Sequence, residues 1–434
     1  MRIKLLIIVG ILAVIAGGLW LAFGGTDVAR LSVEAVSGAK PKITDPREQT
    51  IPTVKVADAV GWANGAKPTP AAGLAVNEFA GKLDHPRWLY ELPNGDVLVA
   101  ETNSPPREGG GVTGFVMRRL MGKAGAGGPS ANRITLLRDT NDDGVADQRS
   151  VLLTGLNSPF GMALVGDRLF IGNHDALVAY PFRVGQTTIT AKPELIVKLP
   201  GGGNHWAKNI IASPDGQLIY IGVGSSSNIA ENGMEAEDHR ANILEVSVEA
   251  KTMRIFASGL RNPVGMSWEP KTNALWTVVN ERDMLGSDLA PDYMTRVEFG
   301  AFYGWPYSYW GGYEDQRVER RPDLLQYTKR PDYALGPHTA SLGLAFGSLG
   351  GLKNGMFVGQ HGSWNRVPVS GYKVVFVPFG ANGYPNGPVQ DLLTGFLTKD
   401  GKAQGRPVGV IIAKAGGLLV ADDVGNRIWR VSGR

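Results

Sequence analysis

Residues 86–102 read PRWLYELPNGDVLVAET, two alternating apolar runs on either side of a Pro-Asn-Gly-Asp turn. Such a pair of runs around an Asn-Gly turn is typical of a β-hairpin. The arrangement returns along the chain, each copy opening on a proline or small residue and, in most copies, a glycine–apolar pair. The further copies are residues 159–173, 207–225, 263–280, 340–360 and 407–422. The pattern predicts a repeated two-stranded unit.

These hairpins recur at intervals of roughly 50 to 75 residues, a spacing that suits propeller blades with loop insertions. A single hairpin cannot bury its own apolar faces, whereas six arranged radially can. The 59 glycines and 27 prolines are spread through the chain, as expected for many short strands joined by tight turns. We therefore predict an all-β fold, one six-bladed β-propeller.

The composition excludes several classes of protein. The 434 residues are 43% apolar and 19% charged, which argues against wholesale disorder. A net charge of +4 is too small and too dispersed for a nucleic-acid-binding surface. The chain has no cysteine, so disulfides, thiolate metal sites and cysteine nucleophiles are excluded.

Residues 1–25 have the composition of a membrane or export segment. Arg2 and Lys4 precede an uncharged apolar run, residues 5–23, long enough to span a bilayer. We expect an uncleaved anchor, with a cleaved signal peptide as the alternative. Either reading places the rest of the chain on the periplasmic side of the inner membrane or in the periplasm.

The remaining chain divides at residue 79. Residues 26–79 contain several prolines and little periodicity, so we expect a linker or loosely docked arm. Residues 80–434 carry all six copies and form the predicted catalytic propeller. The loops between copies should gather around the central channel at one end, where we look for chemistry.

The loop before the third copy reads GGGNH and ends at His205. Glycines let backbone approach a ligand closely, and histidine exchanges protons near neutral pH. His205 is therefore a candidate general base, with turn capping as the alternative.

Two further loops carry charged residues. Arg261 and Asn262 precede the fourth copy, and an Arg-Asn pair can bind a carboxylate, although capping of strand carbonyls is an equal alternative. Glu281 and Asp283 follow that copy, and acidic side chains with loop carbonyls can bind Ca²⁺, a surface charge cluster being the alternative. Arg366 and Arg406 add cationic groups in the loops around the sixth copy.

A separate acidic loop begins at Asp139. Asp139, Asn141, Asp143 and Asp147 stand at positions 1, 3, 5 and 9, with glycine at position 6, which is the spacing of a calcium loop. A hairpin turn that needs no metal explains the same residues equally well. Either way we expect no catalytic role.

Taken in order, the segments GGGNHWAKN, SGLRNPVGM, VVNERDMLG, FYGWP, FVGQHGSWNR, GRPVGV and LLVADDVGNRIWRV resemble the glucose/sorbosone dehydrogenase family, on its L-sorbosone dehydrogenase-like branch. The resemblance runs from about Phe79 onward. It implies a six-bladed propeller that uses pyrroloquinoline quinone (PQQ) together with Ca²⁺.

The resemblance also implies roles for particular residues. His205 falls at the position of the catalytic base. Glu281 and Asp283 lie in the stretch that provides cofactor contacts and calcium ligands in relatives. Val408 replaces the second of two arginines that pair with cofactor carboxylates. The implied cofactor contacts are Lys208, Arg261, Asn262, Arg282, Arg366 and Arg406.

The implied reaction is hydride transfer from an aldose or hydrated sugar aldehyde to PQQ, with His205 removing the hydroxyl proton. Electrons then pass to an external quinone or cytochrome, since no haem-attachment motif is present. Substrate specificity is expected from loops such as residues 225–240 and 307–330. A calcium-dependent propeller hydrolase or lactonase and a non-catalytic binding propeller remain as alternatives.

Overall fold

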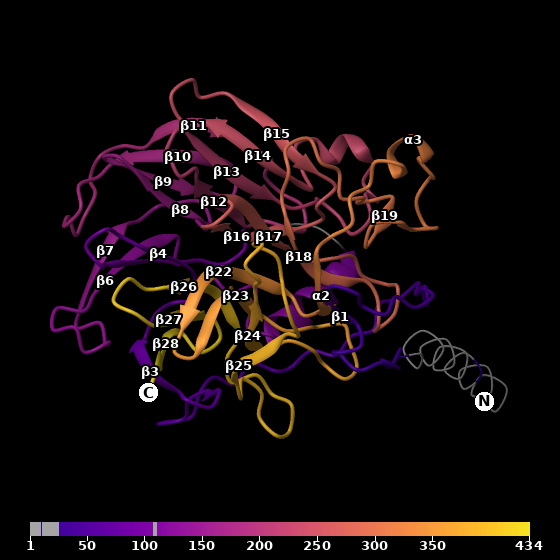
Figure 1. Ribbon diagram of the computed structural model, residues 1–434, viewed down its shortest axis with the longest axis horizontal. Coiled ribbons are helices and arrows are strands. Elements are labelled where there is room, and N and C mark those ends of the chain that lie inside the picture. The colour runs from indigo at the N-terminus through magenta and orange to yellow at the C-terminus, as the bar shows by residue number, and fades with distance from the viewer. Residues whose placement is uncertain (1–9, 11–25, 107–110) are drawn as a thin grey trace, which may run out of the picture.

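A computed structural model describes residue 10 and residues 26–106 and 111–434 (Figure 1). In this part of the chain the strands form six sheets of four or five strands, plus one two-stranded ribbon. The innermost strands of the six sheets neighbour one another in a closed ring. The prediction of a six-bladed propeller is confirmed.

Each blade is an antiparallel meander whose first strand is innermost. The first three blades consist of β4 (Pro86–Glu91), β5 (Val97–Glu101), β6 (Arg133–Arg138) and β7 (Gln148–Leu153); β8 (Met162–Val165), β9 (Arg168–Gly172), β10 (Ala176–Pro181) and β11 (Glu194–Lys198); and β12 (Lys208–Ala212), β13 (Leu218–Val223), β14 (Asn242–Ser247) and β15 (Met253–Ser258). The six predicted hairpins are the two inner strands of each blade.

The other three blades recruit strands from the region before the repeats. They consist of β16 (Pro263–Glu269), β17 (Ala274–Val279), β18 (Pro291–Arg296), β21 (Tyr333–Pro337) and β1 (Ser37–Gly38); β22 (Ser341–Leu349), β23 (Leu352–Gln360), β24 (Lys373–Pro378), β25 (Gln390–Thr394) and β2 (Thr69–Pro70); and β26 (Pro407–Ile412), β27 (Leu418–Asp422), β28 (Arg427–Gly433) and β3 (Leu74–Ala80). Because β3 completes the sixth blade, the propeller begins at residue 74 rather than 80.

The arm before the propeller is held at several points. Besides supplying β1 and β2, it pairs Arg47 with Asp27 and Asp288, with contacts at 2.6 and 3.1 Å. Trp62 donates its indole N–H to the buried carboxylate of Asp422 at 2.6 Å. The arm therefore packs along the fourth, fifth and sixth blades instead of hanging loosely.

A glycine near the start of the inner strands lets the blades approach. A Cβ on Gly161 would lie 2.2 Å from Ile210 N, and one on Gly343 would lie 2.2 Å from Val408 O. Real side chains never approach backbone so closely, so a larger residue would push neighbouring blades apart. This close approach explains the glycine–apolar pair that recurs in the sequence.

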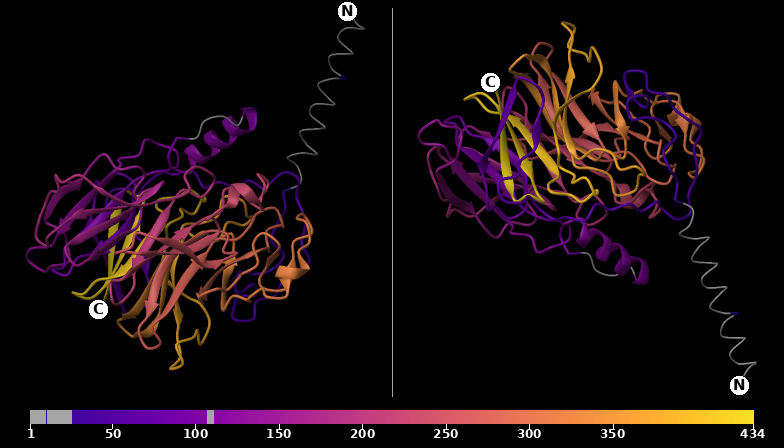
Figure 2. Two further views of the ribbon diagram at one scale, coloured as in Figure 1. Left: turned by 90° about the horizontal axis from the view of Figure 1, so that it is seen from above. Right: turned by 90° about the horizontal axis from the view of Figure 1, so that it is seen from below.

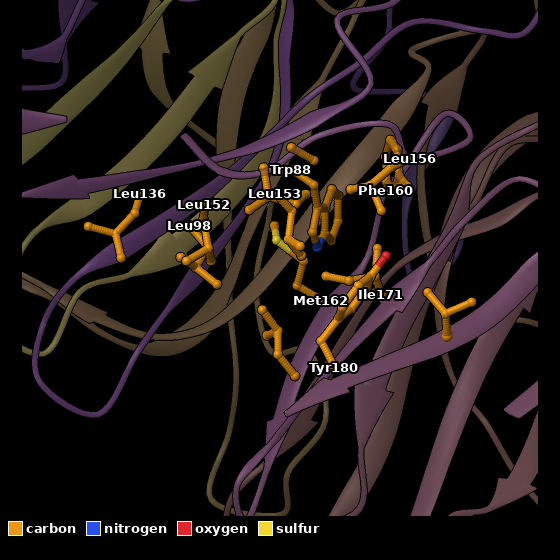
Figure 3. Packing of buried hydrophobic residues seen from close by; sticks show 14 of the residues in the cluster. Trp88, Leu98, Leu136, Leu152, Leu153, Leu156, Phe160, Met162, Ile171 and Tyr180 are labelled. Carbon is orange, nitrogen blue, oxygen red and sulfur yellow. The ribbon is translucent and has the colours of Figure 1, made fainter. Parts of the chain in front are cut away.

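Apolar side chains fill the space between blades. Between the first and second blades, Trp88 and Phe160 lie with ring centroids 4.9 Å apart (Figure 3). Trp206 packs edge-on against Phe160 at 5.7 Å, which links this core to the loop that carries His205.

Within residues 26–106 and 111–434, the helical segments are short and lie in the connections. They are α2 (Gly111–Lys123), the 3-10 turn η1 (Met234–Glu237) and α3 (Pro322–Leu325), while β19 (Ser308–Tyr309) and β20 (Tyr313–Glu314) form the small ribbon. Figure 2 shows α2 projecting from one face of the disk, with the C-terminal end on the other.

The predicted anchor, residues 1–25, lies outside the described residues except for Gly10. In the part that the structure does describe, no helix is long and apolar enough to cross a membrane.

Candidate functional site

The predicted loops meet at one end of the central channel. Each blade's inner strand starts at this end and its second strand returns to it, so the loops before the first strand and after the second strand share one face. We call this end of the channel the mouth. The loops holding His205, Arg261, Asp283, Arg366 and Arg406 all lie there.

His205 presents a defined tautomer at the mouth. Its Nδ1 lies 2.8 Å from Ser225 O and 3.1 Å from Ser225 Oγ. A carbonyl oxygen can only accept, so Nδ1 carries the proton, and in the neutral ring the basic lone pair belongs to Nε2. This is the arrangement that a general base needs.

Two side chains, His174 and Arg240, hold the glycine-rich loop that precedes His205. His174 Nδ1 donates to Trp206 O at 3.2 Å, and His174 Nε2 accepts the Gly202 N–H at 2.7 Å. Arg240 donates to the carbonyls of Gly201 and Gly202. Burial and the charge of Lys208 lower the pKa of His174, so the ring stays neutral and can accept this amide.

A buried carboxylate holds the neighbouring loop. Glu237, in η1, accepts from Ser226 N at 2.7 Å, Ser226 Oγ at 2.6 Å and Ser227 Oγ at 3.0 Å. Since Ser225 anchors the imidazole of His205, Glu237 indirectly fixes the orientation of that ring.

His205 and Asn262 lie against the same side of Gly224. A Cβ on Gly224 would lie 2.5 Å from His205 Cβ and 2.3 Å from Asn262 Oδ1. Asn262 Nδ2 donates to Asn280 Oδ1 at 3.3 Å, and Asn280 Nδ2 donates to Ser341 O at 2.6 Å. A row of amide groups thus runs from His205 across the inner strands of the fourth and fifth blades.

Arg261 is fixed beside this row by backbone and side-chain oxygens. Its guanidinium donates to Asn228 O at 3.1 Å, Asn228 Oδ1 at 2.9 Å and Glu281 O at 2.6 Å. Longer contacts reach Asn280 O at 3.4 Å and Asp283 Oδ2 at 3.3 Å. The two longer contacts are the ones that an anionic ligand oxygen can replace most readily.

Asp283 is already surrounded by donors and cations. Asn365 Nδ2 donates to its Oδ1 at 2.7 Å, and His338 Nδ1 lies 3.5 Å from the same oxygen. Burial alone would raise the pKa of Asp283, but Arg261 and His338 outweigh it and hold the pKa below its usual range. In turn, Asp283 raises the pKa of His338 against the effect of burial.

Glu281 and Arg282 form a buried ion pair with each other. Arg282 Nε donates to Glu281 Oε2 at 2.9 Å, and the rest of the guanidinium contacts Pro306 O, Ser308 O and Asp315. Arg282 is fully buried, so this geometry gives no support to its predicted cofactor contact.

The two carboxylates predicted to bind Ca²⁺ therefore face cations of the protein itself. Glu281 pairs with Arg282 and Asp283 with Arg261. Residues 26–106 and 111–434 contain no group of three or more His, Asp or Glu side chains that could hold a metal ion. The carboxylates of Glu281 and Asp283 do not fit a calcium site in this arrangement.

Lys208 lies beneath the mouth rather than in it. It is fully buried, and its ammonium donates to Trp206 O at 3.2 Å. Burial and the charge of Arg240 lower the pKa of Lys208 to about 7. This placement supports a role in holding the His205 loop instead of contact with a ligand.

The guanidinium groups of Arg366 and Arg406 also donate hydrogen bonds to loop carbonyls. Arg366 donates to Ser287 O at 2.9 Å and Pro368 O at 2.8 Å. Arg406 donates to His361 O and Gly362 O, both at 3.1 Å. Arg406 thus fixes the loop of His361 at the mouth, whereas Arg366 secures the loop that follows it.

A polar cluster of Arg87, His361 and Asp423 lies across the mouth from Asn262 and was not predicted from the sequence. Arg87 and His361 both bond to Asp423 Oδ2, the latter at 2.8 Å. The Arg87 guanidinium lies 5.9 Å from the ring of Trp206, beside His205. Within the described residues, Arg87 Nε and Asp423 Oδ1 are buried without a hydrogen-bond partner. Such atoms indicate a ligand or water.

The charges of this cluster balance, because the one arginine, Arg87, is paired with the carboxylate of Asp423. Burial would raise the pKa of Asp423, but His361, His85 and Arg87 hold it well below its usual range. Burial lowers the pKa of His361 to about 3, so the ring is neutral and donates from Nε2. The position of Arg87 in an ordinary strand start, PRWL, gave no sequence signal of this role.

The acidic loop 139–147 lies at the other end of the propeller, between β6 and β7. Asp139 accepts the backbone N–H groups of Asp143 and Gly144, and Asp147 accepts from Thr140. Asn141 Oδ1 likewise accepts the Asp143 N–H at 3.2 Å. These oxygens close a tight turn, and the loop contributes nothing to the mouth.

A family model described as TrAA12-like matches residues 68–292 and 319–434, most of the chain and every blade. The chain belongs to the TrAA12-like family. The match includes His205, Arg261, Asn262, Arg87 and the loops around them. It omits residues 293–318, which follow the start of β18.

Among curated proteins, this TrAA12-like chain is similar to the pyrroloquinoline quinone-dependent pyranose dehydrogenase of Coprinopsis cinerea, with 25% identity over 84% of the chain and 54% of that protein. The chain spans less than two thirds of the length of the first curated relatives it matches. It is also similar to the aldose sugar dehydrogenase YliI of Escherichia coli, with 27% identity over 33% of the chain and 41% of that protein. The predicted resemblance to quinoprotein sugar dehydrogenases is confirmed.

Solved structures share the fold of this TrAA12-like chain. The PQQ domain of the Coprinopsis cinerea pyranose dehydrogenase superposes with a TM-score of 0.67 and 21% identity, over 87% of this chain and all of that one. The Trichoderma reesei family AA12 enzyme gives a TM-score of 0.69 and 18% identity, over 88% and 99% of the two chains.

Proposed function

We propose that this chain is a PQQ-dependent oxidoreductase that acts on an aldose or a sugar-derived aldehyde hydrate. The observation that carries the proposal is the placement of His205 and Asn262 on one side of Gly224, with Arg261 beside them, at the mouth. A general base next to fixed amide and guanidinium groups suits removal of a hydroxyl proton beside an anionic cofactor.

The residues at the mouth fit an anionic quinone. Arg261 and Arg87 offer guanidinium donors from opposite sides, and Asn262 offers an amide. The unpartnered Arg87 Nε is a donor without an acceptor, which a cofactor carboxylate would supply. When bound, PQQ supplies the two-electron acceptor chemistry that no side chain of this protein provides.

The protein's own part in the reaction is to hold the substrate and move its proton. With Nδ1–H committed to Ser225, His205 Nε2 takes the hydroxyl proton as the adjacent carbon is oxidised. Aldoses and hydrated aldehydes both place a hydroxyl on a carbon that carries hydrogen. The products are a lactone and an acid respectively.

The proposal extends to location and partners. The apolar run of residues 5–23 supports an anchor or export signal, with the propeller outside the cytoplasmic membrane. A membrane quinone or a cytochrome would then accept the electrons. Fractionation of cells, with and without residues 1–25, tests the location independently of activity.

Reconstitution tests the main proposal. Full-length protein in mild detergent is treated with chelator and titrated with PQQ, with and without Ca²⁺, while cofactor absorbance is followed. Dye reduction is then measured across aldoses and aldehydes. Saturable binding and sugar-driven reduction are expected. Absence of binding at micromolar PQQ would overturn the proposal and favour a hydrolase or a binding propeller.

The same titration tests the calcium part of the prediction. If Ca²⁺ is needed, its ligands must be other than the paired carboxylates of Glu281 and Asp283. We therefore expect Asp283→Asn to leave any calcium requirement unchanged. A loss of that requirement in the variant would show that the carboxylate is a ligand after all.

A further inference from the structure

The segment between β18 and β21, residues 297–332, connects two outer strands of the fourth blade, yet part of it reaches the mouth. We call it the blade-four insertion; it contains β19, β20 and α3. Its first half, up to residue 318, falls in the stretch that the family model leaves unmatched. The argument for its role at the mouth therefore rests on its own contacts, although its FYGWP segment, residues 302–306, is one of those that carry the family resemblance.

The insertion is fastened by the buried Arg282. This guanidinium donates to Pro306 O at 2.7 Å, to Ser308 O at 2.6 Å and to Asp315 Oδ2 at 3.2 Å. It also lies 5.6 Å from the ring of Tyr309. A fully buried arginine with this many acceptors holds its loop in one position.

From that position the insertion contacts Asn228. Trp305, buried at 3% exposure, donates its indole N–H to Asn228 O at 3.0 Å. Asn228 belongs to the loop after β13, in the neighbouring blade. The bond joins the insertion to the loop that follows Ser225.

Asn228 is also the main acceptor for Arg261. Its O and Oδ1 take the Arg261 Nε and Nη2 protons at 3.1 and 2.9 Å. Its side chain then holds the next loop, because Oδ1 accepts Asp283 N at 2.8 Å and Nδ2 donates to Asp283 O at 3.2 Å. One asparagine therefore sets the distance between Arg261 and Asp283.

A second contact from the insertion supports the same loop. Arg317 Nη1 donates to Asp283 O at 3.0 Å and to Met284 O at 3.3 Å, while Asp315 pairs with its guanidinium at 2.7 Å. Asp315 also contacts Arg282, so both contacts with the mouth arise from one fastened unit.

We propose that Trp305 and Asn228 are positioning residues that hold the Arg261 guanidinium in place for the anionic cofactor, and that the blade-four insertion is the brace behind them. The inference rests on the proposed function for its consequence, but not for the brace itself. Loss of the Trp305 bond loosens Asn228, and with it the contacts of its O and Oδ1 with Arg261 Nε and Nη2 at 3.1 and 2.9 Å.

The test compares Trp305→Phe with Trp268→Phe in the full-length protein. Trp268 donates its indole N–H to Ala212 O at 2.8 Å in the inner strands, away from the mouth, so the control loses a bond of the same kind elsewhere. Amide hydrogen exchange of apo protein is read in peptides covering residues 225–230 and 280–285. PQQ affinity and kcat at saturating PQQ are measured in parallel.

We expect Trp305→Phe to speed exchange in both peptides and to weaken PQQ binding about fivefold, the effect of one hydrogen bond, with a smaller change in kcat. Trp268→Phe should change neither readout. Asn228→Ala, which removes the acceptor of Arg261 Nη2 and Asp283 N, should weaken binding further.

Two results would overturn the inference. Equal exchange in the two tryptophan variants shows that there is no brace. Faster exchange with unchanged PQQ affinity shows a brace that does not serve Arg261. If wild-type protein binds no PQQ, the proposed function fails, while the exchange comparison still decides whether the brace exists.

Discussion

The two sides of the mouth use charged residues in opposite ways. On the third-blade side, His174, Arg240 and Glu237 bond to loop groups and so position the ring of His205. On the fourth-blade side, Glu281 pairs with Arg282, and Asp283 with Arg261. The first side orients a reactive group, whereas the second builds a rigid frame. A charged residue near a channel is thus informative only once its partner is known.

The comparison depends on His205 being the reactive group. We therefore expect His205→Ala to cause the largest loss of activity. Loss of a general base typically lowers kcat by about 10²- to 10⁴-fold. PQQ affinity should change far less, because Arg261, Asn262 and Arg87 remain. Single-turnover reduction of bound cofactor by sugar measures this directly. A variant with near wild-type kcat would move the base to another residue.

A smaller loss is expected from Glu237→Gln, which tests whether positioning matters on the third-blade side. The substitution keeps the shape but removes the charge that strengthens three hydrogen bonds to Ser226 and Ser227. We expect stability to fall by about 1.5–3 kcal/mol and kcat to fall about tenfold. Glu235→Gln, an exposed neighbour in the same 3-10 turn, is the matched control for both measurements.

On the fourth-blade side, the paired charges should affect how the stability of the protein depends on pH. Asp283 raises the pKa of His338 despite burial, so the charged ring stabilises the fold. That stabilisation is fully present below the ordinary histidine value of 6.5 and is lost as pH rises through the raised folded value. The Tm of thermal unfolding should therefore fall more steeply between about pH 6 and 9 in wild type than in His338→Gln. Parallel curves of Tm against pH for the two proteins would show that the pairing of His338 with Asp283 does not stabilise the fold.

Lys208 contributes to the same curve with the opposite sign. Its pKa falls from 10.5 to about 7 on folding, so between these values its effect on stability improves as pH rises. His338→Gln must therefore be compared with wild type at each pH, so that the contribution of His338 is obtained as a difference.

The smallest effect is expected at the far end of the propeller. The oxygens of loop 139–147 already accept backbone N–H groups, so Ca²⁺ should change Tm by less than about 1 °C. Asp139→Asn should then behave as wild type does with and without the ion. A Ca²⁺-dependent rise in Tm that the variant loses would make this loop a metal site.

Periodicity predicted the fold well because it is a local property. Alternation, the turn after Pro93 and the recurrent glycine each depend on neighbours along the chain or on one adjacent strand. The position of His205, Arg261 and Asn262 in loops at the mouth could be predicted for a similar reason, since they stand next to the glycine and proline that shape their loops.

Partners across loops could not be predicted. Nothing in the sequence around Arg87 indicates that it meets Asp423, and nothing near Asn228 indicates that it holds Arg261. Glu281 and Arg282 are adjacent in sequence, but their mutual pairing depends on burial by the insertion. Such contacts are set by the closure of the ring rather than by local pattern.

The sixth blade joins early and late parts of the chain, since Ala80 of β3 pairs with Ile428 of β28. The ring therefore cannot close until the chain has been synthesised as far as β28. Until then the edges of β3 and of the last completed blade expose unpaired backbone groups, which invite aggregation. Folding of this protein should be slow, dominated by one long-range closing step, and dependent on whatever shields those edges in the cell.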